Sequence, residues 1–318
     1  NAPTSNSALE VTSGDEIGSI VVDDADATID VGAITSTGVV SNDGTLNVND
    51  AATLASGSNI RTVGGTTNIN ASGVTFDASG AAIDNDNASG AVVNVTEDAT
   101  FIGAVRNGSN NPELNVPSGV TLTIQTGGGD VLHTMTSSNG YTGAGEVVFA
   151  GEEGSHTVRT NGDTFEGKIT VDGPDTEGED LTFQGSLTVG TIETNTTTVL
   201  ETRNGNGTVT TTQDFLVNGF TRFAGNQVTV GGNLNTTAQL DVESPLDVTG
   251  NFTTTQNGGN ANLLVASATT VGGNFEVGDT TQVDAEVTVT GDFVADDQTD
   301  VNATLDVASN VDANAALN

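Results

Sequence analysis

Apolar and polar residues alternate along much of the chain, most regularly after residue 145. Segments 228–234 and 287–293 both place Val, Val, Gly and a larger apolar residue at alternate positions, with Thr, Gly, Asn or Asp between them. Successive side chains of a strand point to opposite faces, so this pattern predicts short strands with one buried face. Helix-forming residues are scarce, with a single Met and a single Lys (Lys168), and we therefore expect almost no helix.

The strands belong to an internal repeat that becomes visible when the segments are aligned on glycine. A frame of apolar-x-Gly-x-apolar recurs six times, at Phe165/Gly167/Ile169, Phe183/Gly185/Leu187, Val230/Gly232/Leu234, Val248/Gly250/Phe252, Val271/Gly273/Phe275 and Val289/Gly291/Phe293. Between the last four copies the number of the glycine rises by 18, 23 and 18. A unit this short cannot bury its apolar face alone, so neighbouring units are expected to stack.

The stacking unit predicts an all-β fold, a single-stranded parallel β-helix (β-solenoid) with rungs of about 18–28 residues. The alternative is an array of immunoglobulin-like β-sandwiches, whose turn signals, about every 8 to 12 residues, are also present. A sandwich does not predict the return of one frame at a fixed spacing. We therefore favour the solenoid.

Like residues of a parallel solenoid lie on top of one another, one rung apart. The frame glycine is expected at a bend of the coil, followed by an Asn or Asp that suits a turn. The apolar residue that ends each frame is expected in one inward-facing ladder, formed by Val147, Ile169, Leu187, Phe215, Leu234, Phe252, Phe275 and Phe293.

The two parts of the chain differ in regularity. Residues 1–140 have a similar residue composition but a less regular repeat, whereas residues 141–318 carry the glycine frame. Gly127–Gly129 is a soft break between them. We expect one continuous domain, with less regular solenoid rungs first and regular rungs after them.

The charge balance narrows the function. The chain of 318 residues has 42 acidic and 6 basic side chains, a net charge of −36, and this excludes nucleic-acid binding, which needs a basic face. No apolar stretch approaches the length of a membrane span, which takes roughly 18 residues or more. The excess of carboxylates suits a saline or marine setting, where salt screens their repulsion.

Calcium is the one cofactor that the sequence suggests, because Ca²⁺ is bound by about six to eight oxygen ligands and Asp-rich turns supply them. No segment matches the loop of an EF-hand, so the signal is compositional. The candidate ligands are Asp23, Asp24, Asp26, Asp84, Asp86, Asp172, Asp175, Asp180, Asp296, Asp297 and Asp300.

The sequence gives little support for catalysis. The two histidines, His133 and His156, lie in unrelated surroundings and are expected at the surface, and there is no Gly-x-Ser-x-Gly elbow. Cysteine is absent, which removes thiolate metal sites and disulfides. A polysaccharide-acting β-helix enzyme would need paired carboxylates with aromatic or basic support, and such support is thin here. We therefore expect no catalytic residues.

The Gly-Asn-Leu/Phe rungs at 232–234, 250–252 and 273–275, together with the Thr/Asn/Val/Asp texture, resemble the parallel β-helix surface proteins of prokaryotes. The nearest class is that of filamentous-haemagglutinin and autotransporter-passenger stalks, and the match covers about residues 145–310. This resemblance implies an exported adhesin, fibre or surface-layer component, extracellular or at the cell surface, without catalytic residues.

Two functions follow as hypotheses. The first is a secreted structural subunit of an extracellular filament, sheath or surface layer, in which copies of the chain stack end to end because a solenoid has open edges at both ends. The second is a monomeric adhesin or carbohydrate-binding stalk, whose partners are glycans. The first predicts a homopolymer, and the second a localised binding surface.

Overall fold

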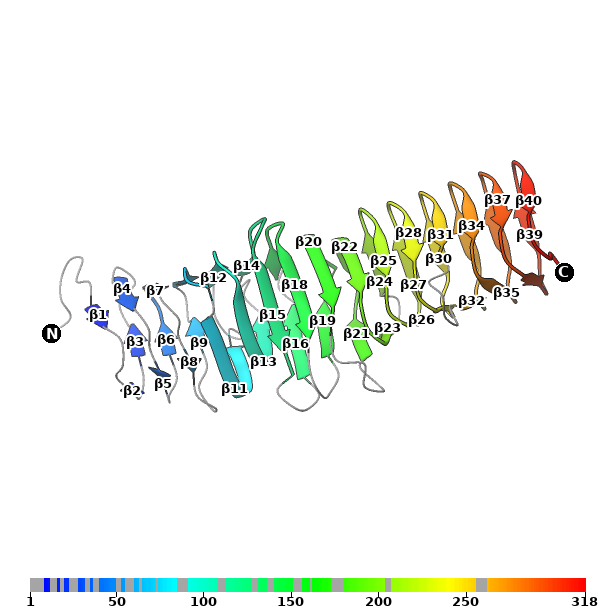
Figure 1. The fold of residues 1–318 in the computed structure, drawn as a ribbon. Coiled ribbons are helices and arrows are strands. Elements are labelled where there is room, and N and C mark those ends of the chain that lie inside the picture. The colour runs from blue at the N-terminus through cyan, green and yellow to red at the C-terminus, as the bar shows by residue number, and fades with distance from the viewer. Residues whose placement is uncertain are drawn as a thin grey trace. The chain divides into compact units, whose positions relative to one another are not determined.

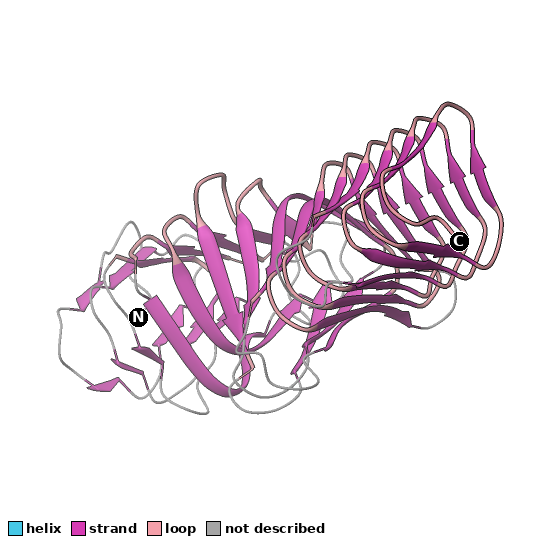
Figure 2. Ribbon diagram, turned by 45° about the vertical axis from the view of Figure 1, so that its right-hand side comes forward, coloured by secondary structure: helices cyan, strands magenta, loops and turns pink. Residues whose placement is uncertain are grey.

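The computed structural model has no helix among its described residues, which form forty β-strands (Figure 2). The structure describes residues 9–11, 16–17, 20–22, 28–31, 35–36, 40–49, 53–54, 60–62, 65–72, 74–84, 91–107, 113–126, 131–135, 140–150, 156–160, 162–172, 180–203, 207–255 and 262–318. Strands pair in parallel, each with the equivalent strand one coil further along the chain. The fold is therefore an all-β parallel β-solenoid, as the sequence predicts.

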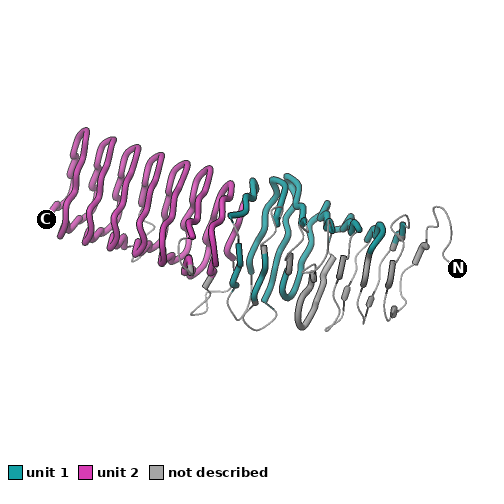
Figure 3. Tube along the Cα trace, turned by 180° about the vertical axis from the view of Figure 1, so that it is seen from behind, with its two compact units in different colours: residues 1–167 teal, residues 168–318 magenta. Residues whose placement is uncertain are grey.

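The chain divides into two compact units, residues 1–167 and 168–318 (Figure 3). In the first unit a seven-stranded parallel sheet follows the chain from coil to coil (Figure 1). Its strands are β1 (Leu9–Val11), β4 (Thr28–Val31), β7 (Thr45–Val48), β10 (Thr66–Ile69), β12 (Val92–Val95), β14 (Glu113–Asn115) and β17 (Tyr141–Thr142).

The other strands of the first unit form the remaining sides of its coils. They are β2 (Glu16–Ile17), β3 (Ile20–Val22), β5 (Thr35–Ser36), β6 (Val40–Asn42), β8 (Thr53–Leu54), β9 (Ile60–Thr62), β11 (Val74–Asp84), β13 (Ala99–Asn107), β15 (Thr121–Gln125), β16 (Val131–Met135), β18 (Glu146–Ala150) and β19 (His156–Thr160), followed by β20 (Asp163–Val171). The long strand β11 pairs with both β8 and β9, so it serves two sides of one coil.

The second unit is more regular, with most coils made of three short strands. The strands are β21 (Asp180–Gln184), β22 (Leu187–Thr194), β23 (Thr198–Arg203), β24 (Thr208–Thr211), β25 (Phe215–Val217), β26 (Thr221–Ala224), β27 (Gln227–Val230), β28 (Leu234–Thr236), β29 (Leu240–Val242), β30 (Leu246–Val248), β31 (Phe252–Thr254), β32 (Asn262–Val265), β33 (Thr269–Val271), β34 (Phe275–Val277), β35 (Thr280–Val283), β36 (Val287–Val289), β37 (Phe293–Ala295), β38 (Thr299–Val301), β39 (Leu305–Val307) and β40 (Val311–Ala313).

The lengths of the coils match the predicted rungs closely. The shortest shift between paired residues of described strands is 17, from Ile29 to Leu46, and the longest is 28, from Arg106 to Thr134. From Phe275 onward every coil repeats with a shift of 18, as in the pairing of Phe275 with Phe293. The frame spacings of 18, 23 and 18 therefore correspond to true coils.

One inward column runs through the second unit and forms much of its core. Phe215 pairs with Leu234, Leu234 with Phe252, Phe252 with Phe275 and Phe275 with Phe293, and all five side chains are fully buried. The rings of Phe252 and Phe275 stack with centroids 4.7 Å apart. Because each ring covers the next, the column excludes water without a large core in any single coil.

Leu187 is the exception to the predicted ladder. It pairs with Val209 in the neighbouring column, and Ile192 is the residue that pairs with Phe215. The frame containing Leu187 lies at a different corner, since Gly185 is stacked under Gly207 just before β24, whereas Gly232 lies between β27 and β28. Ile169 is buried in β20, and Val147, in the first unit, is buried and pairs with Leu122.

The frame glycines of the second unit lie at bends, as expected, and a second constraint also requires them. The N–H of Gly250 donates to the carbonyl of Gly232 at 2.9 Å, and a Cβ on Gly250 would lie 2.6 Å from that oxygen. Gly273 and Gly291 are crowded in the same way by the glycine one coil before each. The corner therefore needs glycine because two backbones meet there.

Candidate functional site

An asparagine and aspartate ladder runs along one corner of the second unit, the corner that contains Gly232, Gly250, Gly273 and Gly291. At each step the side-chain Oδ1 accepts the backbone N–H of the equivalent residue in the next coil, at 2.7–3.0 Å. The members in order are Asp214, Asn233, Asn251, Asn274, Asp292 and Asn310. These bonds satisfy backbone donors that the bend removes from the strand ladder.

A second ladder of this kind lies on the seven-stranded sheet of the first unit. Here each amide Nδ2 donates to the Oδ1 of the residue one coil earlier, at 2.7–3.2 Å, through Asp30, Asn47, Asn68, Asn94 and Asn115. An amide is both donor and acceptor, so an asparagine column continues through many coils without an unpaired group. The polar face of this sheet is therefore a regular stack of equivalent side chains.

The ladders also explain how so acidic a chain stacks its coils. In the last coils Asp284 accepts an amide hydrogen from Asn302, Asp296 from Asn314 and Asp300 from Asn318, each 18 residues away. Hydrogen bonds from Ser309 and then Asn310 lower the pKa of the Asp292 carboxyl. A carboxylate stacked against an Asn side chain accepts a hydrogen bond from its amide. A second carboxylate at the same position would repel the first.

Asp279 and Asp297 depart from this rule. They occupy equivalent positions one coil apart, and Asp279 is buried. Burial, together with the nearby charge of Asp297, raises the pKa of Asp279 against the opposing effect of a 3.0 Å hydrogen bond from the Thr280 N–H. The position one coil after Asp279 therefore holds a carboxylate, whereas the positions one coil after Asp284, Asp296 and Asp300 hold amides.

The structure places only part of the predicted calcium ligands. Asp23, Asp24, Asp26, Asp86 and Asp175 lie outside the described residues, as do the side chains of Asp84 and Asp180, whose backbones lie in β11 and β21. Asp172 is exposed just after β20, and Asp296, Asp297 and Asp300 surround the start of β38. Among described residues no three His, Asp or Glu side chains converge as a metal site would require, and calcium binding stays a prediction.

The two histidines are not at the surface, contrary to expectation. His133 on β16 and His156 on β19 are both buried, and their Nε2 and Nδ1 atoms lie 3.0 Å apart. Burial is the main cause that lowers both pKa values, that of His156 to about 4. Their separation of 23 residues differs from the shift of 25 at which β16 pairs with β19, where His133 is opposite Val158, so the repeat spacing in the sequence does not mark the pair.

The coil at 299–318 is covered on one side by described strands and uncovered on the other. Strands β39 and β40 pair with β36 and β37 on one side, and no other described strand pairs with them on the opposite side. Exposure of the inward column rises in this coil, since Phe293 is fully buried, whereas Val311, next in its column, is 52% exposed. Leu317 is 40% exposed.

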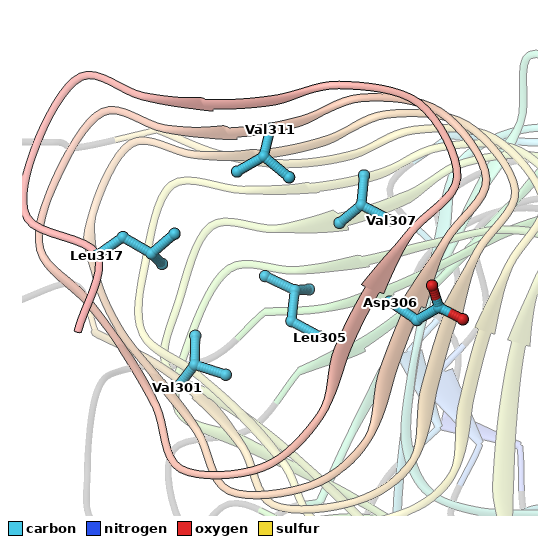
Figure 4. Close-up of a pocket in the computed structure, with 6 residues that line it drawn as sticks. All are labelled: Val301, Leu305, Asp306, Val307, Val311 and Leu317. Atoms are coloured by element: carbon cyan, nitrogen blue, oxygen red, sulfur yellow. The ribbon is translucent and has the colours of Figure 1, made fainter.

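These exposed side chains line an apolar hollow of about 490 Å³ (Figure 4). Figure 4 shows Val301, Leu305, Val307, Val311 and Leu317 pointing into the space enclosed by the last coil, with Asp306 pointing away from it. The hollow is the core of the solenoid seen in cross-section. It combines an apolar centre with a rim of unpaired backbone groups, the two features that the next coil of a solenoid would cover.

Within the described residues no helix is long and apolar enough to cross a membrane. The parallel pairing between successive coils places the protein in the class of all-β parallel β-solenoids. Comparison with protein-family models, with curated proteins and with solved structures found no match to this chain.

Proposed function

We propose that the protein is a structural subunit of an extracellular filament, sheath or surface layer, in which copies stack end to end through the open edge of the coil at 299–318. The observation that carries this proposal is the contrast between Phe293, fully buried by the coil that follows it, and Val311, which is 52% exposed in the same column. Repetition of one column of equivalent apolar side chains from Phe215 to Phe293 suits a structural material.

The edge offers apolar side chains that a partner can bury and backbone groups that it can hydrogen-bond, and both stabilise a contact. Full burial of a Val or Leu side chain contributes about 1.5–3 kcal/mol, and the hollow offers Val301, Leu305, Val307, Val311 and Leu317. Pairing the free edges of β39 and β40 with incoming strands would add backbone hydrogen bonds of about 0.5–1.5 kcal/mol each. A contact between two different edges of identical copies is heterologous, and it propagates as a filament when the rotation between successive copies does not close a ring.

Sedimentation velocity as a function of protein concentration tests the proposal. Val311→Asp places a charge in the hollow and is expected to leave only monomers, whereas the wild-type chain forms larger species. Thr210→Asp, on the outward face of β24 between Thr188 and Thr229, is the matched control and is expected to assemble as the wild type does. Equal sedimentation of wild type and Val311→Asp at every concentration would refute assembly through this edge.

A second candidate is a monomeric adhesin or carbohydrate-binding stalk, supported by a shallow groove of about 310 Å³ on the side of the second unit. The groove is lined by Gln239, Asp241, Asn262, Leu263, Leu264, Thr280 and Gln282. Amide and carboxylate groups beside an aliphatic floor suit a neutral glycan. Glycan-array binding by the wild-type monomer, abolished by Asp241→Ala together with Gln282→Ala, would favour this function.

A further inference from the structure

A chain of three hydrogen bonds fixes the protonation of the buried histidine pair. The backbone N–H of Val105 donates to Nδ1 of His133 at 3.2 Å, so this nitrogen carries no proton. Nε2 of His156 lies 3.2 Å from the carbonyl oxygen of Ala150, which only accepts, so Nε2 of His156 carries its proton. Nδ1 of His156 then accepts from Nε2 of His133, 3.0 Å away. Both rings are neutral, and every ring nitrogen has a partner.

The surroundings of the pair are apolar. The Phe149 ring packs against both imidazoles, with centroid distances of 5.5 Å to His133 and 5.2 Å to His156. Val105 and Val158 are fully buried beside them on β13 and β19. A proton added to either ring would place a positive charge here and would turn one acceptor nitrogen into a second donor facing an N–H group.

The ionisable groups on the neighbouring strands do not offset that charge. With described side chains they are Glu146 on β18, Arg159 on β19, and Asp163, Glu166 and Lys168 on β20. The side chains of Asp77 and Asp84 on β11, Arg106 on β13 and Asp180 on β21 are outside the described residues. Glu146 and Arg159 lie at the outward positions of their strands, and Asp163 has its own interactions. The ionisable group that acts on His133 is His156, and the effect is repulsive.

We propose that the His133–His156 pair is an acid-sensitive latch that holds β13, β16 and β19 together at neutral pH and releases them in mild acid. The latch is independent of the assembly proposal. The opened state, in which both rings reach water, takes up protons as the pH falls below about 6.5, while the closed state remains neutral. Closure is therefore fully favoured above that pH and is progressively lost below it.

The second unit is a built-in control, because residues 168–318 contain no histidine. Acidification from pH 7.5 to pH 5 also reduces the general repulsion between carboxylates, which acts on both units and in the opposite direction. Amide hydrogen exchange, corrected for the intrinsic pH dependence of the rate, measures opening in each unit of the same molecule. The comparison needs no substitution, so it does not depend on a variant that folds.

We expect the protection of β16 and β19 amides to fall at least about 30-fold between pH 7.5 and pH 5, the factor for one histidine of ordinary pKa in the open state. Amides of β28 and β31 should keep or gain protection. In His156→Gln, whose side chain donates and accepts without titrating, the loss should be smaller than in the wild type. An equal change in both units would overturn the proposal, as would imidazole NMR signals that titrate near pH 6.5 in the folded protein.

Discussion

Asn233 and Asn251 lie one coil apart, and the Oδ1 atom of Asn233 accepts the backbone N–H of Asn251 at 2.9 Å. The same contact recurs from Asp214 to Asn310, always beside a corner where two backbones meet. Each of these coils therefore supplies a side-chain oxygen that accepts a backbone N–H of the next coil. Each coil depends on its neighbour for a hydrogen-bond partner at this corner.

Removal of one ladder member should weaken the solenoid locally. Asn251→Ala leaves the Asn274 N–H without its acceptor and is expected to cost about 0.5–1.5 kcal/mol in urea unfolding. Asn235→Ala is the control, because Asn235 lies on the outward face of β28 with no side-chain bond to a described residue, and its cost should stay within about 0.5 kcal/mol. Equal costs would show that the ladder contributes nothing.

The phenylalanine column should be sensitive in its middle and tolerant at its end. Phe275→Ala removes a ring that stacks on Phe252 and meets Phe293 edge-on, and it is expected to cost about 3–5 kcal/mol. Val311→Ala, in the same column but half exposed, should cost less than about 1 kcal/mol in the monomer. Chemical denaturation of both variants at low protein concentration measures the difference, and similar costs would contradict a continuous column.

The Tyr141 hydroxyl is buried, and no described group is within hydrogen-bonding reach of it, although its ring packs edge-on against Phe165. Burial also raises the pKa of this phenol. Tyr141→Phe keeps the ring contact and removes the polar atom, so it should leave stability unchanged or raise it by up to about 1 kcal/mol. A lower melting temperature would mean that the hydroxyl has a partner.

The stacked pair Asp279 and Asp297 should make stability depend on salt. Asp279→Asn is expected to raise the melting temperature, chiefly because burial disfavours the charged carboxylate, and the smaller part of the gain that comes from repulsion by Asp297 should be lost at about 1 M salt, where the Debye length is near 3 Å. Asp296→Asn is the control, because Asp296 already accepts an amide hydrogen from Asn314 and should gain nothing. A gain that disappears entirely at about 1 M salt would point to charge repulsion, rather than burial, as the main cause.

The same pair predicts a pH effect. Because the pKa of Asp279 is raised in the folded protein, the folded state binds this proton more readily than the unfolded state does, and stability should increase as the pH falls through the raised value. Asp279→Asn should lose this part of the increase. Thermal melts of both proteins between pH 6 and pH 4 would detect it.

The sequence predicts most of the fold because the same pattern of apolar residues and corner glycines recurs in successive coils of a solenoid. Alternation and the glycine frame identify the inward residues Leu234, Phe252, Phe275 and Phe293 from local spacing alone. The prediction misplaces Leu187 because the same short frame serves two different corners, and the local sequence does not distinguish them. Register depends on which coil lies beneath, and that is not a local property.

The site is harder to predict than the fold. His133 and His156 have different neighbours in sequence and meet only because β16 and β19 occupy successive coils. The stacking of Asp on Asn likewise depends on register. Asp296 and Asn314 form a hydrogen bond only because the coils place residues 18 positions apart next to each other. The predicted calcium ligands carry a compositional signal only, and composition does not bring oxygen atoms together.

Negative-stain electron microscopy of the purified chain at high protein concentration and high salt tests the central claim most directly. If the edge at 299–318 joins copies end to end, the wild-type protein will form unbranched filaments of constant width, and Val311→Asp will form only short separate particles. Short separate particles for the wild type under the same conditions would contradict the account.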